Sequence, residues 1–405
     1  MKYLASLLLA TSLVSTPICT AKAEPIAQFE ISNISNNLFS FSPDGAVFAS
    51  IVDVDKVPQM ELHNSETGEL ITRSTQSVSG TFSPAWTSDG HGLYTEGGGQ
   101  EQMLHWDGKK WNLLDLKGIE FGLFSFGRAE LSADATMLSV DNFKTDISIV
   151  RLANQSWQLL DTQEEISDLA IWSPDGRYLA TGHGGTVILW DAKKLHEVRR
   201  FEGLVPDNDY NRFTSIDTLD WSPSGQYLAI GTSIGNGYLV DLENTEADPI
   251  DLLGDFTSVS QLQWVLKTGL FWQEQEVLIY KASNEKVHED HLLWYDPEDN
   301  DVIYDHMVGP QSPLLFIGGN FLVQTLIGSG KAVVQTEMPD LVRQISINYI
   351  SVIEPDGNSV RKKLPDNFRG MAISPDGRFI VIREYVDNRV QKASLWGFDT
   401  FIDEL

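Results

Sequence analysis

The chain has 405 residues, with 29 lysines and arginines against 57 aspartates and glutamates, for a net charge of −28 at pH 7. Such an acidic surface repels phosphate backbones and anionic lipids, so we expect no nucleic-acid or acidic-membrane partner. The single cysteine, Cys19, excludes an internal disulfide and a thiolate metal site.

The first 23 residues show the three parts of a secretory signal in the right order. Lys2 supplies the positive start, residues 4–14 form a short apolar run, and Ala21-Lys22-Ala23 is a small-x-small cleavage site. The apolar run is shorter than the roughly 20 residues that span a bilayer, and no later segment reaches that length. We therefore predict export, to a bacterial periplasm or the medium, with cleavage near Ala23. Lipidation of Cys19 remains the alternative.

The mature residues, 24–405, contain a repeated turn. Ser-Pro-Asp-Gly occurs at residues 42–45, 173–176 and 374–377, with near copies at 88–90 and 222–225 and a decayed copy, Ser-Ala-Asp-Ala, at 132–135. Proline presets the first corner, aspartate tolerates the second, and glycine allows the reversal, so each copy between two apolar runs predicts a hairpin. The predicted structural turn residues are Asp44, Gly45, Asp89, Gly90, Asp175, Gly176, Gly225, Asp376 and Gly377.

A third run in most units ends in an apolar residue followed by aspartate, and a fourth run comes after it, as at residues 197–201. Four short strands per unit are typical of a β-propeller blade. The predicted blade-end residues are Trp106, Asp107, Trp190, Asp191, Asp241, Asp296 and Asp399.

The spacing of the turns predicts how many units there are. Two degenerate units fill the gap before residue 374: one around Trp264 and Gly269, the other with its turn at 316–319 and its second strand at 321–323. Eight units of about 48 residues result, close to the 40–45 of WD40-type repeats. We predict one all-β domain, a propeller of eight four-stranded blades, with seven as the alternative. Tryptophans before three turns, Trp172, Trp221 and Trp264, are expected to pack between blades.

Residues 166–203 resemble a WD40 repeat, with W-S-P-D-G-R-Y-L-A-T-G followed by G-T-V-I-L-W-D. The other units resemble it more weakly. Two parts of the family pattern are missing, because residues 163–165 replace its Gly-His pair and Gly184-Gly185 replaces its turn aspartate. The resemblance therefore implies a propeller held by packing, without the family's His–Asp–Ser–Trp network, that presents loops to protein partners.

Two motifs resemble those of enzymes only superficially. Residues 231–235 match the G-x-S-x-G pattern, but a strand follows them where a nucleophile elbow needs a helix, so we expect a hairpin turn. Residues 328–331, Gly-Ser-Gly-Lys, lack the first glycine and the final Ser or Thr of a phosphate-binding loop.

His288 and His291 are the metal candidates, because two histidines three residues apart can share an ion. A solvated connection between strands is the favoured interpretation, and we expect no metal and no cofactor. The acidic run at 296–301 lacks the glycine and the terminal glutamate of a dedicated calcium loop.

The predicted function is an exported, monomeric scaffold that binds a protein. Its contact surface is expected on the rim where three connections look enlarged, at residues 204–213, 281–291 and 384–390. The alternative is a carboxylate–metal hydrolase of the lactonase type, with Asp168, Asp217 and Asp220 in the central channel.

The last unit has three predicted strands, at 370–373, 378–383 and 393–398, and only seven residues after them. An open edge there would expose unpaired backbone groups. Residues 26–31 lie before the predicted first strand at 38–41, and Ala27, Phe29 and Ile31 alternate with polar residues. We predict that this segment becomes the fourth strand of the last unit and closes the ring, and that residues 400–405 contribute little.

Overall fold

The computed structural model describes most of the chain from residue 23 onward. The described residues are 23–31, 39–78, 84–87, 90, 92–96, 102–115, 129–140, 147–153, 156–159, 169–205, 215–244, 247–268, 274–284, 287, 289–308, 321–325, 332–340, 345–354, 358–385 and 391–405.

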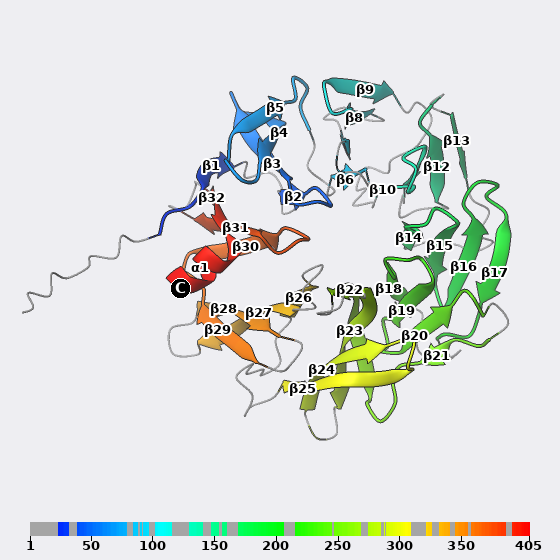
Figure 1. The fold of residues 1–405 in the computed structure, drawn as a ribbon. Coiled ribbons are helices and arrows are strands. Elements are labelled where there is room, and N and C mark those ends of the chain that lie inside the picture. The colour runs from blue at the N-terminus through cyan, green and yellow to red at the C-terminus, as the bar shows by residue number, and fades with distance from the viewer. Residues whose placement is uncertain are drawn as a thin grey trace, which may run out of the picture.

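The described strands form eight four-stranded antiparallel sheets, which Figure 1 shows arranged around a common centre. We number these sheets as units 1 to 8. Units 1 and 2 contain β2 (Phe39–Phe41), β3 (Val47–Val54), β4 (Val57–Asn64) and β5 (Leu70–Arg73), then β6 (Ala85–Trp86), β7 (Leu93–Glu96), β8 (Gln102–Trp106) and β9 (Trp111–Asp115). Units 3 and 4 contain β10 (Ala129–Leu131), β11 (Met137–Val140), β12 (Ser148–Arg151) and β13 (Ser156–Leu159), then β14 (Leu169–Trp172), β15 (Tyr178–His183), β16 (Thr186–Asp191) and β17 (Glu197–Phe201).

The remaining units repeat this order, with the first strand innermost in the view (Figure 1). Units 5 and 6 contain β18 (Ile216–Trp221), β19 (Tyr227–Thr232), β20 (Gly237–Asp241) and β21 (Ile250–Asp251), then β22 (Ser258–Thr268), β23 (Glu274–Asn284), β24 (Glu289–Asp296) and β25 (Asp301–Val308). Unit 7 contains β26 (Phe321–Thr325), β27 (Ala332–Asp340), β28 (Ile345–Ile353) and β29 (Ser359–Lys363), and unit 8 contains β30 (Phe368–Ile373), β31 (Phe379–Tyr385), β32 (Gln391–Gly397) and β1 (Ala27–Ile31).

Unit 8 is built from both ends of the chain. β1 pairs antiparallel with β32, with Ala27 opposite Leu395 and Ile31 opposite Gln391, as the alternation of residues 26–31 predicts. The amide of Ile26 extends the pairing by donating to the carbonyl of Leu395 at 2.7 Å. β1 thus occupies the place that the fourth strand holds in every other unit.

Both degenerate segments form sheets of their own, but the prediction assigned the strands of unit 7 to the wrong positions within the sheet. Residues 321–325 are the first strand, β26, rather than the second, and the connection to β27 falls at 326–331. That connection contains the Gly-Ser-Gly-Lys run, which lies outside the described residues, as does the predicted turn at 316–319. The prediction placed the turn of unit 7 from the repeat spacing alone. Spacing cannot distinguish the glycine-rich segment at 316–319 from the one at 326–331.

The hydrophobic core is divided among the seams, meaning the contacts between neighbouring units. One cluster joins Val381 and Leu395 of unit 8 with Phe48 of unit 1 and Leu93 of unit 2. Other clusters join units 3 and 4, 4 and 5, 5 and 6, and 7 and 8. Because each sheet buries both faces against its neighbours, its strands read as continuous apolar runs.

The last residues form a helix, which the sequence interpretation did not predict. α1 spans Phe398–Glu404 and buries Phe398 and Phe401 in the cluster shared by units 7 and 8. The ring of Phe401 lies 5.7 Å from that of Trp396, and the amide of Ala23 donates to Glu404 Oε2 at 3.2 Å. The expectation that residues 400–405 contribute little is therefore withdrawn. Among the described residues, no helix has the length and apolar character to cross a membrane.

Truncating Ile31 tests whether β1 closes unit 8. Ile31 is 5% exposed and belongs to the core cluster of units 8, 1 and 2. Ile31→Ala should lower the free energy of unfolding by about 2 kcal/mol or more, because it leaves a cavity in that core. Gln28→Ala, on the exposed side of the same strand, should change it by no more than about 0.5 kcal/mol. Equal effects in urea unfolding would show that β1 is not part of the cooperative fold.

Candidate functional site

The repeated turn is a small hydrogen-bonded unit. In unit 4 the hydroxyl of Ser173 donates to Asp175 Oδ1 at 2.7 Å and accepts the amide of Tyr178 at 2.9 Å. Asp175 Oδ1 also accepts the amide of Arg177 at 2.9 Å. The same bonds recur in the turns at 42–47, 132–137 and 374–379. Serine and aspartate are thus fixed at these positions by the turn itself. Asp89 lies outside the described residues.

Neighbouring turns also contact each other across the seams. A Cβ atom on Gly225 would lie 2.7 Å from the carboxyl carbon of Asp175, and one on Gly45 would lie 2.8 Å from Asp376 Oδ1. Gly90 is nearly as tight, at 3.2 Å from Asp44 Oδ1. The three glycines also have φ of +70° to +74°, which L side chains adopt only under strain. Each glycine is therefore required twice, by its own turn and by the preceding unit.

Two arginines strengthen these contacts. Arg177 pairs with Asp175 and reaches the carbonyl of Gly225 in the next unit at 3.4 Å. Arg378 pairs with Asp376 at 2.5 Å and with Glu66 of unit 1 at 3.2 Å. Burial alone would raise the pKa of Asp376, but hydrogen bonds from Ser374 and Arg378 outweigh it and lower that pKa.

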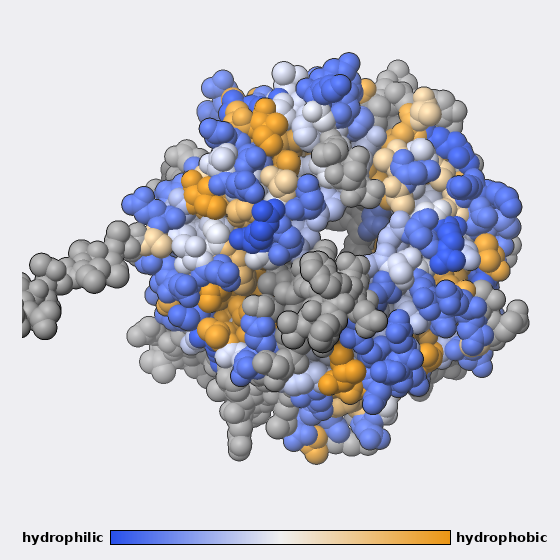
Figure 2. All heavy atoms as spheres, in the orientation of Figure 1, coloured by the Kyte–Doolittle hydropathy of each residue, from blue (hydrophilic) through white to orange (hydrophobic). Residues whose placement is uncertain are grey.

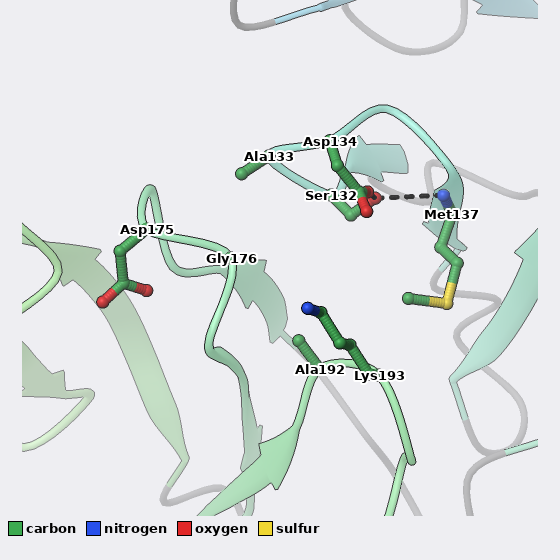
Figure 3. A pocket seen from close by; sticks show the side chains of 8 residues that line it. All are labelled: Ser132, Ala133, Asp134, Met137, Asp175, Gly176, Ala192 and Lys193. Atoms are coloured by element: carbon green, nitrogen blue, oxygen red, sulfur yellow. Dashed lines mark hydrogen bonds between the residues drawn. The ribbon is translucent and has the colours of Figure 1, made fainter.

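The seam between units 3 and 4 departs from this pattern. The nearest atom to a Cβ on Gly176 is Ala133 Cβ at 3.7 Å, so no aspartate fills that space. Thr136 stands where Arg177 and Arg378 stand in their turns. A pocket of about 270 Å³ opens here (Figure 3). We call it the seam pocket, and it is lined by Ser132, Ala133, Asp134, Met137, Asp175, Gly176, Ala192 and Lys193.

Asp134 and Lys193 carry the charges of this pocket, and both are exposed. Hydrogen bonds from Thr136 and Ser132 lower the pKa of Asp134 against the opposing effect of its partial burial. Met137 and Ala192 are buried and give the pocket an apolar floor. Arg151 donates to the sulfur of Met137 at 3.4 Å, which helps to hold that side chain in place. In Figure 3 the Asp175 side chain points away from the other lining residues.

Tryptophans link the inner strands of neighbouring units. The indole N–H of Trp172 donates to Ser139 Oγ at 3.1 Å, that of Trp221 to the carbonyl of Ile171 at 3.3 Å, and that of Trp264 to the carbonyl of Asp220 at 3.1 Å. All three are 6–7% exposed. They pack between units, as predicted, and none is available as a ligand platform.

Four of the five blade-end aspartates lie at the end of the third strand of their unit or directly after it, where they accept amide hydrogens of the next turn. Asp191 Oδ1 accepts from Lys193 at 3.1 Å and Lys194 at 2.8 Å, and the other examples are Asp107, Asp241 and Asp296. The amide of Lys110 and the side chain of Asn112 lower the pKa of Asp107 to about 2. Asp399 differs because it lies in the first turn of α1.

Unit 4 contains a polar chain that the sequence interpretation did not predict. The indole of Trp190 donates to Thr181 Oγ1 at 2.9 Å, and this hydroxyl lies 2.7 Å from His183 Nε2. All three side chains are buried. This polar chain differs from the family's His–Asp–Ser–Trp network, because its histidine lies at the end of β15 and is linked to the tryptophan through a threonine.

The G-x-S-x-G segment is a packing feature. Cβ atoms on Gly231, Gly235 and Gly237 would lie 2.6, 2.5 and 2.5 Å from Leu262, Ser258 and Val259 of unit 6. Ser233 Oγ accepts the amide of Ser215 at 2.9 Å. The glycines therefore let units 5 and 6 approach, and the serine is held in a hairpin connection.

The channel carboxylates are also engaged in the fold. Asp220 Oδ2 accepts the amide of Trp264 across the seam at 3.0 Å, and Asp217 Oδ1 accepts the hydroxyl of Ser215 at 3.1 Å. Burial raises the pKa of Asp220 to about 7, although the amides of Trp264 and Trp221 oppose the shift. Asp168 lies outside the described residues.

His291 binds Asp305 at 2.6 Å through Nδ1, and its ring lies 5.0 Å from that of Phe256. Its predicted partner, His288, lies outside the described residues. In the described part of the chain, no three His, Cys, Asp or Glu side chains are grouped to hold a metal ion.

The enlarged connection predicted at 281–291 is mostly strand. β23 continues to Asn284 and β24 begins at Glu289, with Lys281 opposite Leu292 and Asn284 opposite Glu289. Unit 6 therefore carries a long hairpin, and only residues 285–288 connect its strands. Most of the other two predicted loops lies outside the described residues.

Comparisons with known proteins agree with this architecture. Residues 156–191 match the family model "WD domain, G-beta repeat". The β-propeller domain of Cps50 (Swd1) from Myceliophteria thermophila is similar in fold, with a TM-score of 0.52 and 12% identity over 90% of this chain and 98% of that one. A chain from the crystal structure of the mitotic checkpoint complex has a TM-score of 0.49 and 12% identity over 98% of both chains. No curated protein sequence matches the chain.

The fold is thus a β-propeller, and one of its repeats matches the WD40 family model. The matched segment begins with β13, the last strand of unit 3, and ends with β16, the third strand of unit 4. Each sequence repeat therefore contains the outer strand of one sheet and the three inner strands of the next. With this offset, the chain begins with an outer strand that belongs to the last sheet. β1 is that strand.

Sequence reasoning found the turns and the tryptophans but missed the seam pocket. The signal in the sequence is the change from Ser-Pro-Asp-Gly to Ser-Ala-Asp-Ala, together with Thr136 in the arginine position. Without the neighbouring unit in view, that change indicates only decay of the repeat.

Substituting Gly225 tests the contact between turns. Gly225→Ala should destabilise the protein because it adds both backbone strain and a clash with Asp175. Gly203→Ala is the matched control, since Gly203 has φ of +73° against +74° and no atom within 4 Å of its Cβ position. The Gly225 variant should lose at least about 1 kcal/mol more of unfolding free energy. Equal losses would mean that backbone strain alone explains the glycine.

Asp220 predicts a dependence of stability on pH. Its pKa is raised from 3.8 to about 7 in the fold, so the folded state keeps a proton that the unfolded state releases between these values. Unfolding free energy should therefore fall as pH rises from about 4 to 8. Relative to Asp220→Asn, which cannot titrate, the wild-type protein should lose roughly 1–2 kcal/mol over this range, a value reduced to allow for solvent screening. Urea unfolding at several pH values measures it, with Asp217→Asn as the exposed control. Parallel curves for wild type and Asp220→Asn would contradict the shift.

Proposed function

We propose that this chain is an exported scaffold that binds a protein partner and catalyses no reaction. The main support for the proposal is that the candidate catalytic residues form structural hydrogen bonds within the units or across the seams. Asp220, Ser233 and the turn aspartates all form bonds within or between units. The WD40 propeller fold generally mediates protein–protein interaction, which supports the same conclusion.

The hairpin of unit 6 is the best surface for a partner among the described residues. Its strands β23 and β24 extend beyond the length of the second and third strands in units 2 to 5, and Val287 lies in the connection between them. Val287 is 55% exposed, more than any other large apolar residue that the structure describes. An exposed apolar side chain between two long paired strands suits an interface, because the strands that flank it are already ordered before binding.

Polar contacts hold the base of this hairpin in place. His291 bonds Asp305 on the adjacent strand β25 and packs against Phe256, which precedes the unit. The hydroxyl and amide of Thr257 both donate to the carbonyl of Ser283, at 2.9 and 2.8 Å. The space-filling view shows an otherwise mostly hydrophilic face with separate apolar patches and an opening near the centre (Figure 2). A preformed hairpin of this kind favours binding over catalysis.

The hydrolase alternative has less support. It requires a metal held by channel carboxylates, and the two that the structure describes, Asp217 and Asp220, accept hydrogen bonds from Ser215 and Trp264. Binding a metal at Asp220 would break a link between two units. We therefore base the proposed function on the hairpin.

Replacing either of two exposed valines, Val287 and Val198, with aspartate tests the proposal. The full chain, tagged at its C-terminus, is expressed in a bacterium and cross-linked in the periplasm. The recovered protein should begin at Glu24, and wild type and Val198→Asp should capture the same partner. Val287→Asp should reduce that capture at least about fivefold, as expected for a central apolar contact. Val198 is the control because it is 48% exposed on the outer strand of unit 4. Retention in the cytoplasm would overturn export, and equal capture by both variants would overturn the hairpin surface.

A further inference from the structure

The seam pocket lies beside a turn that lacks the arginine found in the turns of units 4 and 8. In units 4 and 8 the turn aspartate pairs with an arginine two residues later, and that arginine reaches into the next unit. In unit 3 the aspartate, Asp134, has the same bonds from its serine and from the following residue, but that residue is Thr136. Within the described part of the chain no cation pairs with Asp134.

The opposite wall of the seam differs as well. Asn64 in unit 1 and Asp191 in unit 4 organise equivalent turns, each accepting amides two and three residues later. Glu66 and Lys193 therefore occupy equivalent positions. Where unit 8 meets unit 1, Arg378 lies between Asp376 and Glu66. Where unit 3 meets unit 4, the arginine is missing and the glutamate is replaced by a lysine.

We propose that the seam pocket binds a segment of a protein partner in which an arginine lies beside an acidic residue. The guanidinium pairs with Asp134, as Arg177 and Arg378 pair with their own turn aspartates, and the acidic side chain pairs with Lys193. The inference rests on the proposed role as a binding scaffold. It concerns the opposite face of the ring, because first-to-second strand turns lie at the other end of each sheet from second-to-third strand hairpins.

The size and lining of the pocket fit this occupant. Its volume of about 270 Å³ lies just below the range of roughly 300–1,000 Å³ that is typical of small-molecule sites, so it suits one or two side chains better than a cofactor. The methylene stem of an arginine has an apolar floor in Met137 and Ala192. Carboxylates bind guanidinium groups through paired hydrogen bonds, which favours arginine over lysine.

Two dipeptides provide the test. N-acetyl-Arg-Glu-amide and N-acetyl-Arg-Gln-amide are titrated into the mature protein with labelled methionine methyl groups, and the Met137 signal is followed among those of the six methionines of residues 24–405. Both peptides should shift Met137, and the Arg-Glu peptide should bind about threefold more tightly because it also reaches Lys193. In Lys193→Gln the preference should disappear. A titration that leaves Met137 unchanged would overturn the proposal.

An internal arginine should block the pocket. Thr136→Arg places a guanidinium beside Asp134 and should weaken binding of both peptides at least about tenfold. Ala46→Arg puts an arginine at the equivalent position of unit 1 and should leave binding unchanged. Asp134→Asn, which removes the charge without changing shape, should weaken binding as well and covers the case in which Thr136→Arg unfolds. Wild-type affinity in both pocket variants would overturn the proposal, while partner capture that still depends on Val287 would leave the scaffold function standing.

Discussion

The structure depends on contacts across the seams, and at three of them (units 8 and 1, 1 and 2, 4 and 5) an aspartate of one turn fills the space beside a glycine of the next. Each core cluster of the described residues draws on at least two neighbouring units, so these units bury their sheets against one another. Stability in such an arrangement comes from interfaces between adjacent repeats. The tryptophan bonds between inner strands and the glycines of the 231–237 hairpin serve the same seams. The glycines of the G-x-S-x-G segment are therefore accounted for by packing.

A ring of such seams has one weak place, where the two ends of the chain meet. Unit 8 takes three strands from the C-terminal end and one from the N-terminal end, so no outer strand is missing there. α1 then covers the cluster between units 7 and 8, and Glu404 accepts the amide of Ala23. An unpaired edge would invite association with other chains, and this arrangement removes it without lengthening the last unit.

The seam pocket shows how imperfect repetition can create a binding site. The turn of unit 3 places Ala133 rather than an aspartate nearest to Gly176 and so leaves the seam unfilled, yet it keeps the serine and aspartate that hold its own shape. The result is an exposed carboxylate, an opposing lysine and a buried apolar floor in a rigid frame. Departures from a local rule within an otherwise regular fold are where function is most often found.

The sequence by itself determined the repeat, the four strands of each unit, the role of the tryptophans and the pairing of residues 27–31 with the last unit. These features follow from local patterns, namely turn residues and alternation, that retain their meaning in isolation. The frame of unit 7, the extension of β23 and β24, the helix at 398–404 and the Trp190–Thr181–His183 chain were decided by tertiary contacts. The seam pocket belongs with them, because whether the space beside Gly176 is filled depends on which side chain unit 3 places opposite it.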